Sequence, residues 1–546
     1  MLTTYQAAYR APFLPSALLL ATLLQGSSFT LTIGFRGPFV SDLLSSLVTL
    51  GWLGMYAMAV IGLISSFGLN WVSWLVRYRL LLTCMIAGAA FSTAWSFDPG
   101  LTLERSIHLI GTTLIAIYLG LSLPLHRILK TSAIVLGLLM VASACIAVFL
   151  PSLGMQNYEG TLVWAGVLAS KNTLGFWSAI TLLLLVSLSF WSISNALRLL
   201  YLVLAIFSLL CLYKSVSATS LLALITSALV MIYLHAAFSL RLGLTAMLVL
   251  GVFVAGLAGV AFHFIDTAEL IGRSGDMTGR GEVWLQTWQL ILERPLTGFG
   301  YGTIWFPTAD TVWIQKELTE FTWTVFHAHN GLLQIASELG LPLAALTLFM
   351  IIQQLVEIVY CQYQRQQPGV LFVLGFTIAL LVSNYTEARL LVNRDLYWIF
   401  FIALPISMLQ QVNVSAAATT AKVAAGKNRS TGRERFEAKR QRVAYKRLLL
   451  RRLYDATSAS TDRHAQMPYR SASNQQVRMA PDASSKPVAS AASRQNSRAN
   501  KQTGAAKTVE YGTLKSAAGS VEQERIHLHR QATGKHWLTR WGKRTG

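Results

Sequence analysis

Long apolar runs dominate this chain and restrict it to very few folds. A bilayer core requires about 20 apolar residues per helical span, because every backbone N–H and C=O must be bonded within the segment. Charged residues make up 13% of the chain, about half the share found in soluble domains. We therefore predict an all-α polytopic membrane protein. About twelve spans are expected, beginning near residues 13, 42, 80, 106, 131, 174, 197, 217, 242, 330, 369 and 394.

The last part of the chain differs sharply in composition from the rest. Residues 412–546 hold 27 Lys and Arg against 8 Asp and Glu, whereas residues 1–411 hold 18 against 16. Such a basic, Ala/Ser/Gln-rich segment buries too little apolar surface to offset chain entropy, which predicts a mostly disordered tail. Residues 436–454 are the exception, with the pattern of a basic amphipathic helix that lies on anionic headgroups. Nucleic-acid binding is the rival interpretation, but this segment lacks an aromatic stacking platform.

The distribution of charge predicts the orientation in the membrane. With a cytoplasmic N-terminus, the basic residues of the short loops fall on the inner side, as the positive-inside rule requires. These are Arg10, Arg77, Arg79, Arg127, Lys130, Arg198, Arg241 and Arg365. An even number of spans returns the tail to the cytoplasm. A polar loop of about residues 265–329, between the ninth and tenth spans, is then extracytoplasmic.

That polar loop and the start of the next span carry an ordered set of motifs. Residues 276–284 read DMTGRGEVW, residues 293–305 ERPLTGFGYGTIW, and residues 326–340 FHAHNGLLQIASELG. Their order and spacing resemble the signature region of the O-antigen ligase and exopolysaccharide polymerase family. Further matches are F-S-x-x-W-S-x-D-P at 91–99, Arg105, S-K-N-x-x-G at 170–175, K-S-x-S-A-T-S at 214–220 and N-Y-T-E at 384–387. The resemblance covers roughly residues 13–411, within the membrane domain expected at 1–411, and none of the tail.

The resemblance implies a glycosyltransferase of the bacterial inner membrane that polymerises polyprenyl-diphosphate-linked repeat units into an exopolysaccharide. An O-antigen ligase acting on a lipid A core, or an oligosaccharyltransferase acting on a protein hydroxyl, would use the same donor chemistry with another acceptor. A transporter is the alternative from another class, but it predicts midplane charges and repeated halves, and no internal repeat is visible. A structural subunit of an export complex is a third. The tail would serve there as a docking arm for export or chain-length-control proteins.

Two residues are the candidates for catalysis. Arginine binds phosphate oxygens through its planar fork and stays charged, and Arg280 occupies the family's T-G-R position. Histidine is the usual base near neutral pH, and His329 matches the family's H-N pair. In a single displacement, His329 would take the proton of the acceptor hydroxyl and Arg280 would stabilise the departing diphosphate, with inversion. Substrate-binding candidates are Arg105, Lys171, Lys214, Trp284, Arg294, Asn330, Glu387 and Arg389.

Each basic residue on the extracytoplasmic side could instead simply pair with a neighbouring acid, and this alternative stays open. His327 is interpreted as a structural histidine. An H-x-H metal pair with His329 lacks a third ligand at recognisable spacing, so a metal-independent reaction without a cofactor is expected. The glycines at 298, 300 and 302 lie outside any βαβ unit, so they indicate tight loop turns rather than a dinucleotide site. The four scattered cysteines indicate no disulfide framework.

Overall fold

The structure is a computed structural model that describes residues 13–26, 41–158, 160–192, 194–240, 256, 280–306, 325–365 and 368–425. Side chains are described except at residues 41–45, 280, 365, 368 and 412–425. The chain divides into two compact units, residues 1–453 and 454–546. All described residues belong to the first unit. The predicted ninth span near residue 242, most of the loop at 265–329 and the amphipathic segment at 436–454 lie outside the described part.

Helices make up nearly all of the described structure. The long ones are α2 (Phe13–Gly26), α4 (Ser41–Phe67), α5 (Asn70–Tyr78), α6 (Leu80–Phe91), α7 (Pro99–Ser122), α8 (Leu125–Phe149), α10 (Lys171–Trp191), α11 (Asn195–Ser215), α12 (Ala218–Ser239), α14 (Arg280–Glu293), α16 (Gly331–Arg365), α17 (Pro368–Thr386) and α18 (Leu396–Ala425). Short elements are η1 (Ser92–Trp95), α9 (Pro151–Gly154), β1 (Met155–Tyr158) and β2 (Thr161–Trp164). The two strands form an antiparallel hairpin in which Met155 pairs with Trp164.

The prediction of a polytopic helical membrane protein is confirmed. Eight of the described helices are long and apolar enough to cross a bilayer, or nine if α5 and α6, bent by 100° at their junction, form one span. α2 and the segment Leu396–Gln411 of α18 are shorter apolar helices. Helices begin close to eleven of the twelve predicted starts, the largest difference being Pro99 against a predicted 106. The total of twelve spans stays a prediction.

Side-chain caps mark several helix starts that the sequence signals. Asp98 accepts a hydrogen bond from the Leu101 N–H at the start of α7, where Pro99 occupies the first helical position. Ser170 accepts from the Thr173 N–H at the start of α10. Such oxygens bond amides that have no partner within the helix. The S-K-N motif therefore begins α10 at a defined residue.

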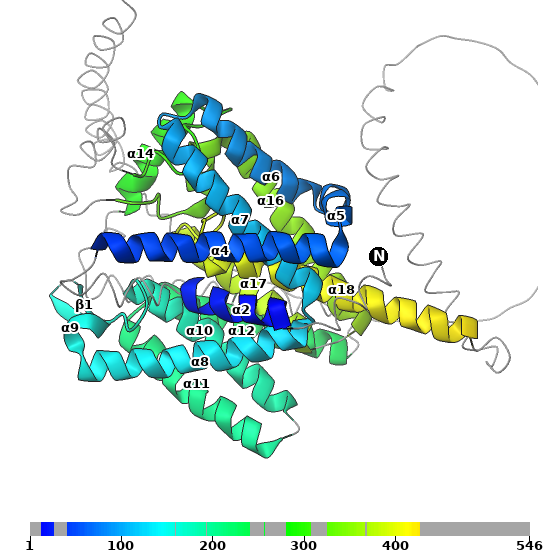
Figure 1. Ribbon diagram of the computed structural model, residues 1–546. Helices are drawn as coiled ribbons and strands as arrows, with labels where there is room; N and C mark the ends of the chain where they lie inside the picture. Colours follow the sequence, from blue (N-terminus) through cyan, green and yellow to red (C-terminus); the bar gives the residue numbers. More distant parts are fainter. Residues whose placement is uncertain are drawn as a thin grey trace, which may run out of the picture. The chain divides into compact units, whose positions relative to one another are not determined.

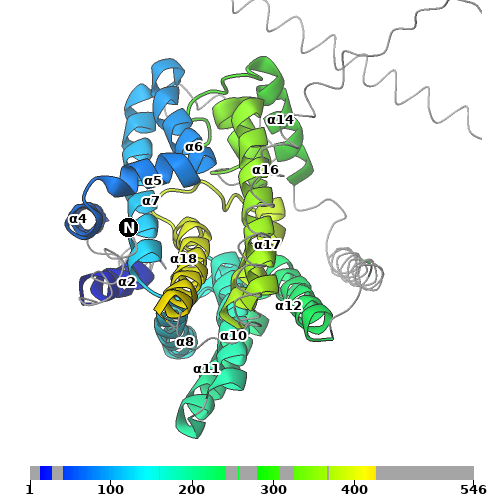
Figure 2. The same ribbon diagram turned by 90° about the vertical axis from the view of Figure 1, so that its right-hand side faces the viewer.

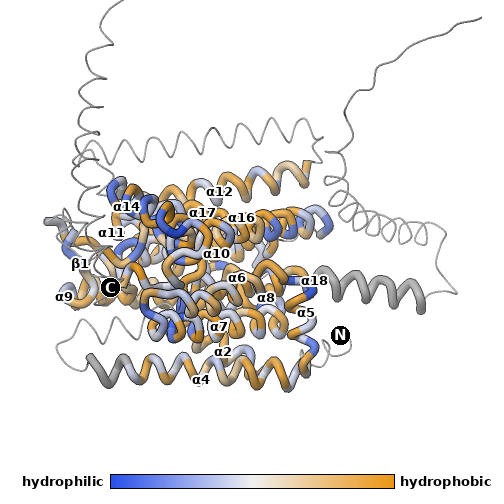
Figure 3. Tube along the Cα trace, turned by 90° about the horizontal axis from the view of Figure 1, so that it is seen from above, coloured by the Kyte–Doolittle hydropathy of each residue, from blue (hydrophilic) through white to orange (hydrophobic). Residues whose placement is uncertain are grey.

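The elements expected on the two sides of the membrane lie at opposite ends of the helices. In Figure 1, α14, α9 and β1 lie at one end, whereas α5 and the C-terminal part of α18 lie at the other. Figure 2 shows α16, α17 and α18 grouped together, and these three helices contact one another in pairs. Along α4, α8 and α12 the colouring of Figure 3 is mainly hydrophobic, as membrane helices require.

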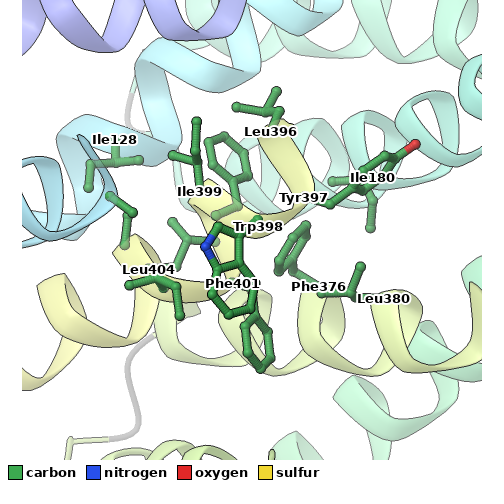
Figure 4. Close-up of a cluster of buried hydrophobic side chains, with 14 of the residues drawn as sticks. Ile128, Ile180, Phe376, Leu380, Leu396, Tyr397, Trp398, Ile399, Phe401 and Leu404 are labelled. Carbon is green, nitrogen blue, oxygen red and sulfur yellow. The ribbon is translucent and has the colours of Figure 1, made fainter. Parts of the chain in front are cut away.

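The start of α18 is the centre of a dense apolar cluster. Figure 4 shows buried side chains from four helices meeting there: Ile128, Ile180, Phe376, Leu380, Leu396, Tyr397, Trp398, Ile399, Phe401 and Leu404. The ring of Trp177 stacks on that of Tyr397 with centroids 4.9 Å apart. This packing holds the beginning of α18, and so it anchors the loop at residues 387–395 that precedes it.

A break in α16 positions the glycine-rich loop at residues 298–302. Gly340 adopts φ +84° inside α16, and Pro342 lacks the N–H that would bond the Glu338 carbonyl. The Leu341 N–H donates to the Pro295 carbonyl at 2.8 Å rather than to a carbonyl of its own helix. The break leaves two backbone carbonyls of α16 without helical partners, and the loop bonds both. The Phe299 N–H donates to the Ser337 carbonyl at 3.1 Å, and the Gly300 N–H donates to the Glu338 carbonyl at 2.9 Å. The Gly-Leu-Pro sequence thus creates the binding edge for this loop.

Candidate active site

His329 lies in the turn that leads into α16. Its backbone is left-handed, with φ +50°. Asn330 caps the helix, because its Oδ1 accepts hydrogen bonds from the Leu332 and Leu333 amides, both at 3.1 Å. The Asn330 Nδ2 donates to the Tyr385 carbonyl at 3.2 Å, which ties this turn to the end of α17. Asn330, a predicted binding residue, therefore holds the turn that contains His329, and its role in substrate binding stays a prediction.

Two histidines and one carboxylate meet beside this turn. The His327 Nε2 lies 3.5 Å from the Glu387 Oε2, and the His329 Nδ1 lies 3.9 Å from the Glu387 Oε1. The two imidazole rings have centroids 4.1 Å apart. Glu387 is 7% exposed. The tertiary fold thus converts the N-Y-T-E motif at 384–387 into the carboxylate partner of the H-N motif.

Asn172, near the start of α10, supports that carboxylate. Its Nδ2 donates to the Glu387 Oε1 at 2.9 Å. The Ser217 hydroxyl in turn lies 3.4 Å from the Asn172 Oδ1 and 2.8 Å from the Ser220 hydroxyl. A Cβ on Gly175 would lie within 2.8 Å of atoms of this serine cluster, so glycine allows the close approach. The S-K-N and K-S-x-S-A-T-S motifs therefore meet behind Glu387.

The donor atoms of His327, His329 and Glu387 lie within 4.8 Å of one another. A tetrahedral zinc ion places its ligand atoms about 3.3 Å apart, so the spacing alone suits a metal. The hydrogen bonding of His327 does not suit a metal ion, because its Nδ1 accepts a hydrogen bond from the His329 N–H at 3.1 Å. A neutral ring then carries its hydrogen on Nε2, the nitrogen that would have to bind the ion. Metal-ligating histidines normally donate from their second nitrogen. The described residues therefore do not fit a metal centre.

Arg389 is buried among protein groups beside this cluster. One terminal nitrogen lies 3.9 Å from the Glu387 Oε2, and its guanidinium lies 4.6 Å from the centre of the Tyr397 ring. Burial raises the pKa of Asp395, in the loop before α18, to about 7, although the Tyr397 amide and the Arg389 charge oppose this. Arg389 thus lies beside Glu387 and interacts electrostatically with Asp395, as the pairing alternative predicted.

The two predicted lysines lie in different environments. Lys171, adjacent to Asn172, is 7% exposed, and its Nζ lies 3.4 Å from the centroid of the Tyr158 ring. The same Nζ lies 3.4 Å from the Val216 carbonyl. The β1–β2 hairpin therefore covers this lysine. Lys214 is exposed at the end of α11 and faces the Tyr213 ring at 5.8 Å.

Arg105 and Arg294 hold the glycine-rich loop. Arg105 donates to the Gly302 carbonyl at 2.6 Å. Arg294 lies over the Phe97 and Phe299 rings, at 4.8 and 4.9 Å from their centres. Each of these predicted phosphate ligands therefore has a contact within the protein, on the loop at residues 298–302.

Trp284 links α14 to the histidine turn. Its indole N–H lies 3.4 Å from the His329 carbonyl, and its ring packs edge-on against Tyr385 with centroids 5.5 Å apart. Arg280 is the first residue of α14, one turn before Trp284. Four residues correspond to about 6 Å along a helix axis. The backbone of Arg280 thus begins one helical turn from a residue in contact with His329.

The structure brings His329, Asn330, Glu387, Arg389 and Trp284 together, with Lys171 one residue from the Asn172 contact. The predicted residues Arg105 and Arg294 lie instead at the glycine-rich loop. Sequence reasoning missed Asn172, although the S-K-N motif contained it, and it assigned His327 a structural role. The missing third partner of the H-x-H pair is Glu387, which no local spacing could indicate.

Comparisons with known proteins agree with the motifs. Residues 202–348 match a family described as O-antigen ligase. The chain is 24% identical over 325 residues to the exopolysaccharide production protein ExoQ of Rhizobium meliloti (strain 1021), which covers 56% of this chain and 71% of that protein. The family match includes α14, the glycine-rich loop, both histidines and the first half of α16.

Proposed function

We propose that this chain is an inner-membrane glycosyltransferase of the O-antigen ligase and exopolysaccharide family. It polymerises polyprenyl-diphosphate-linked repeat units into an exopolysaccharide, without a metal or cofactor. The observation that carries this proposal is that the His329 Nδ1 lies 3.9 Å from the Glu387 Oε1, an oxygen that also accepts a hydrogen bond from Asn172. A base in that arrangement suits abstraction of a hydroxyl proton.

The reaction is a single displacement at the anomeric carbon of the donor sugar. The acceptor oxygen forms the new bond to that carbon as the bond to the diphosphate oxygen breaks, so the configuration inverts. The His329 Nε2 receives the hydroxyl proton, while its Nδ1–H faces the Glu387 carboxylate. The departing diphosphate carries the bonding electron pair and its charge.

Arg280 and the α14 amino terminus supply the positive field for the leaving group. The first amides of a helix have no helical acceptor and carry a partial positive charge, which favours a phosphate. α14 begins at Arg280, and one turn further along the helix the Trp284 indole N–H contacts the His329 carbonyl. Base and leaving-group stabiliser then act on opposite sides of one anomeric carbon.

The proposed site faces the extracytoplasmic side, with both termini in the cytoplasm. In support, α14 and β1 lie at the end of the molecule opposite α5 and the end of α18 (Figure 1). The donor arrives in the outer leaflet, and the basic tail is assigned to export or chain-length-control partners. No nucleic acid is involved.

A ligase that transfers the same donor glycan to a lipid A core is the second candidate. The family description names O-antigen ligase, whereas the name of the relative refers to exopolysaccharide production. The donor half of the reaction is common to both. Only the acceptor differs.

Complementation of a polysaccharide-deficient strain with His329→Ala and Arg280→Ala tests the function. His235→Ala and Arg77→Ala are matched controls, since both residues are exposed on other helices. With normal protein levels in the membrane, single repeat units accumulating on the polyprenyl carrier support the polymerase. Finished but unattached polymer supports the ligase. Wild-type glycan from both site variants would reject this site and favour a transporter.

A further inference from the structure

His327 has a defined tautomer in this structure. Its Nδ1 lies 3.1 Å from the His329 backbone nitrogen, and a backbone N–H is always a donor. The Nδ1 therefore accepts, and the single hydrogen of a neutral ring lies on Nε2. A second proton would displace that backbone hydrogen bond. The turn that gives His329 its left-handed backbone thus favours the form of His327 in which only Nε2 carries a hydrogen.

The Nε2–H of His327 faces one particular oxygen of Glu387. The distance to Oε2 is 3.5 Å, whereas the His329 Nδ1 and the Asn172 amide both face Oε1. A terminal nitrogen of Arg389 also faces this carboxylate, 3.9 Å from Oε2. Asn172 from α10, the two histidines of the turn and Arg389 from the loop after α17 thus each turn a nitrogen toward this carboxylate.

We propose that His327 is a positioning residue: a neutral, single-tautomer donor that occupies the second oxygen of Glu387 and leaves the first oxygen to orient His329. The inference rests on the proposed function and deepens it. A carboxylate without that donor is more basic and attracts the Nδ1–H of His329 more strongly. His329 would then keep an extra proton to higher pH, and the fraction of active base would fall.

Three substitutions distinguish the roles of the two ring nitrogens of His327. His327→Asn places an oxygen near the position of Nδ1 and preserves the turn, since Asn bonds an amide two residues on. His327→Gln places an amide N–H near the position of Nε2 and preserves the donor to Glu387. His327→Ala removes both. Each variant is reconstituted with a polyprenyl-diphosphate-linked repeat unit, and the polymerisation rate is measured from pH 5 to pH 9.

Loss of the donor is expected to move the acid limb of the rate profile. The limb should shift upward by about one pH unit in His327→Ala and His327→Asn, since a hydrogen bond to a charged group contributes about 1.5 to 3 kcal/mol. His327→Gln should stay within about half a unit of wild type, and the rate at pH 9 should change less than about threefold in all three variants. A purely structural role predicts lower protein levels with an unmoved limb.

Several results would overturn the inference. One is a profile for His327→Ala that superimposes on wild type; another is a His327→Gln profile as displaced as that of His327→Ala. A third is one zinc ion per chain retained by purified wild type and lost in His327→Ala, since a metal-bound Nε2 carries no hydrogen. Nitrogen NMR of histidine-labelled protein in bilayers reads the tautomer directly. If no donor is turned over, the proposed function fails, yet the NMR signal of a protonated Nε2 still decides this inference.

Discussion

Replacing Asn172 by aspartate should disable the site while leaving the shape of the side chain unchanged. The Asn172 Nδ2 donates to the Glu387 Oε1 at 2.9 Å, and the substitution puts a carboxylate oxygen in the place of that donor. Loss of a hydrogen bond to a charged group costs about 1.5 to 3 kcal/mol, which corresponds to roughly 10- to 150-fold in rate. Repulsion between two carboxylates about 4 Å apart adds to this near a protein surface.

The two carboxylates would relieve that repulsion by sharing a proton, so the total loss has an upper limit. We expect Asn172→Ala to lower the polymerisation rate about 10-fold and Asn172→Asp about 100-fold at pH 8, with part of the difference recovered at pH 6. The assay is turnover of a lipid-linked repeat unit in proteoliposomes, normalised to the inserted protein. Asn195→Asp is the control, because Asn195 is exposed at the start of α11. A normally inserted Asn172→Asp protein with wild-type turnover would refute the role of Asn172 in holding Glu387.

Three further substitutions test the surroundings of the site. Burial raises the pKa of Asp395 to about 7, so folding takes up a proton between about pH 4 and pH 7. Thermal stability should therefore fall as pH rises across that window and level off above about pH 7. Asp395→Asn should flatten this slope in a detergent melt, and a wild-type slope of opposite sign would contradict the reasoning. Gly331→Ala should destabilise the fold by about 1 to 3 kcal/mol, because a Cβ collides with the Asn384 amide; unchanged melting and turnover would show that the contact relaxes freely. Tyr301→Phe leaves the Leu391 carbonyl without its 2.6 Å hydrogen bond, which should lower the melting temperature through a loss of about 1 to 3 kcal/mol, with turnover per folded molecule retained at 25 °C; equal melting temperatures would reject the reasoning.

The candidate site was predictable as far as local motifs extend. His329 and Asn330 follow from the H-N pair at the start of a span, and Asn330 forms the cap expected of that residue type. Arg280, the arginine of the T-G-R motif, is the first residue of α14. Its role as a diphosphate ligand stays a prediction. Arg105 and Arg294 illustrate the limit, because they contact a carbonyl and two aromatic rings that no local pattern indicates, and their role as substrate ligands stays a prediction. A sequence shows that a cation is present, but not which partner the fold places beside it.

The sequence by itself determined the class of fold, because apolar runs of span length leave a chain no other way to bond its backbone within lipid. It placed the starts of α7 and α10 only to within several residues, near 106 and 174, and the Asp98 and Ser170 caps fix them at Pro99 and Lys171. Only the tertiary structure decided that Glu387 lies between His327 and His329, and that Asn172, 215 residues away in sequence, donates to it. Hydrogen bonds between distant segments depend on how whole helices pack. Packing depends on the shapes of many side chains at once, and no local pattern contains that information.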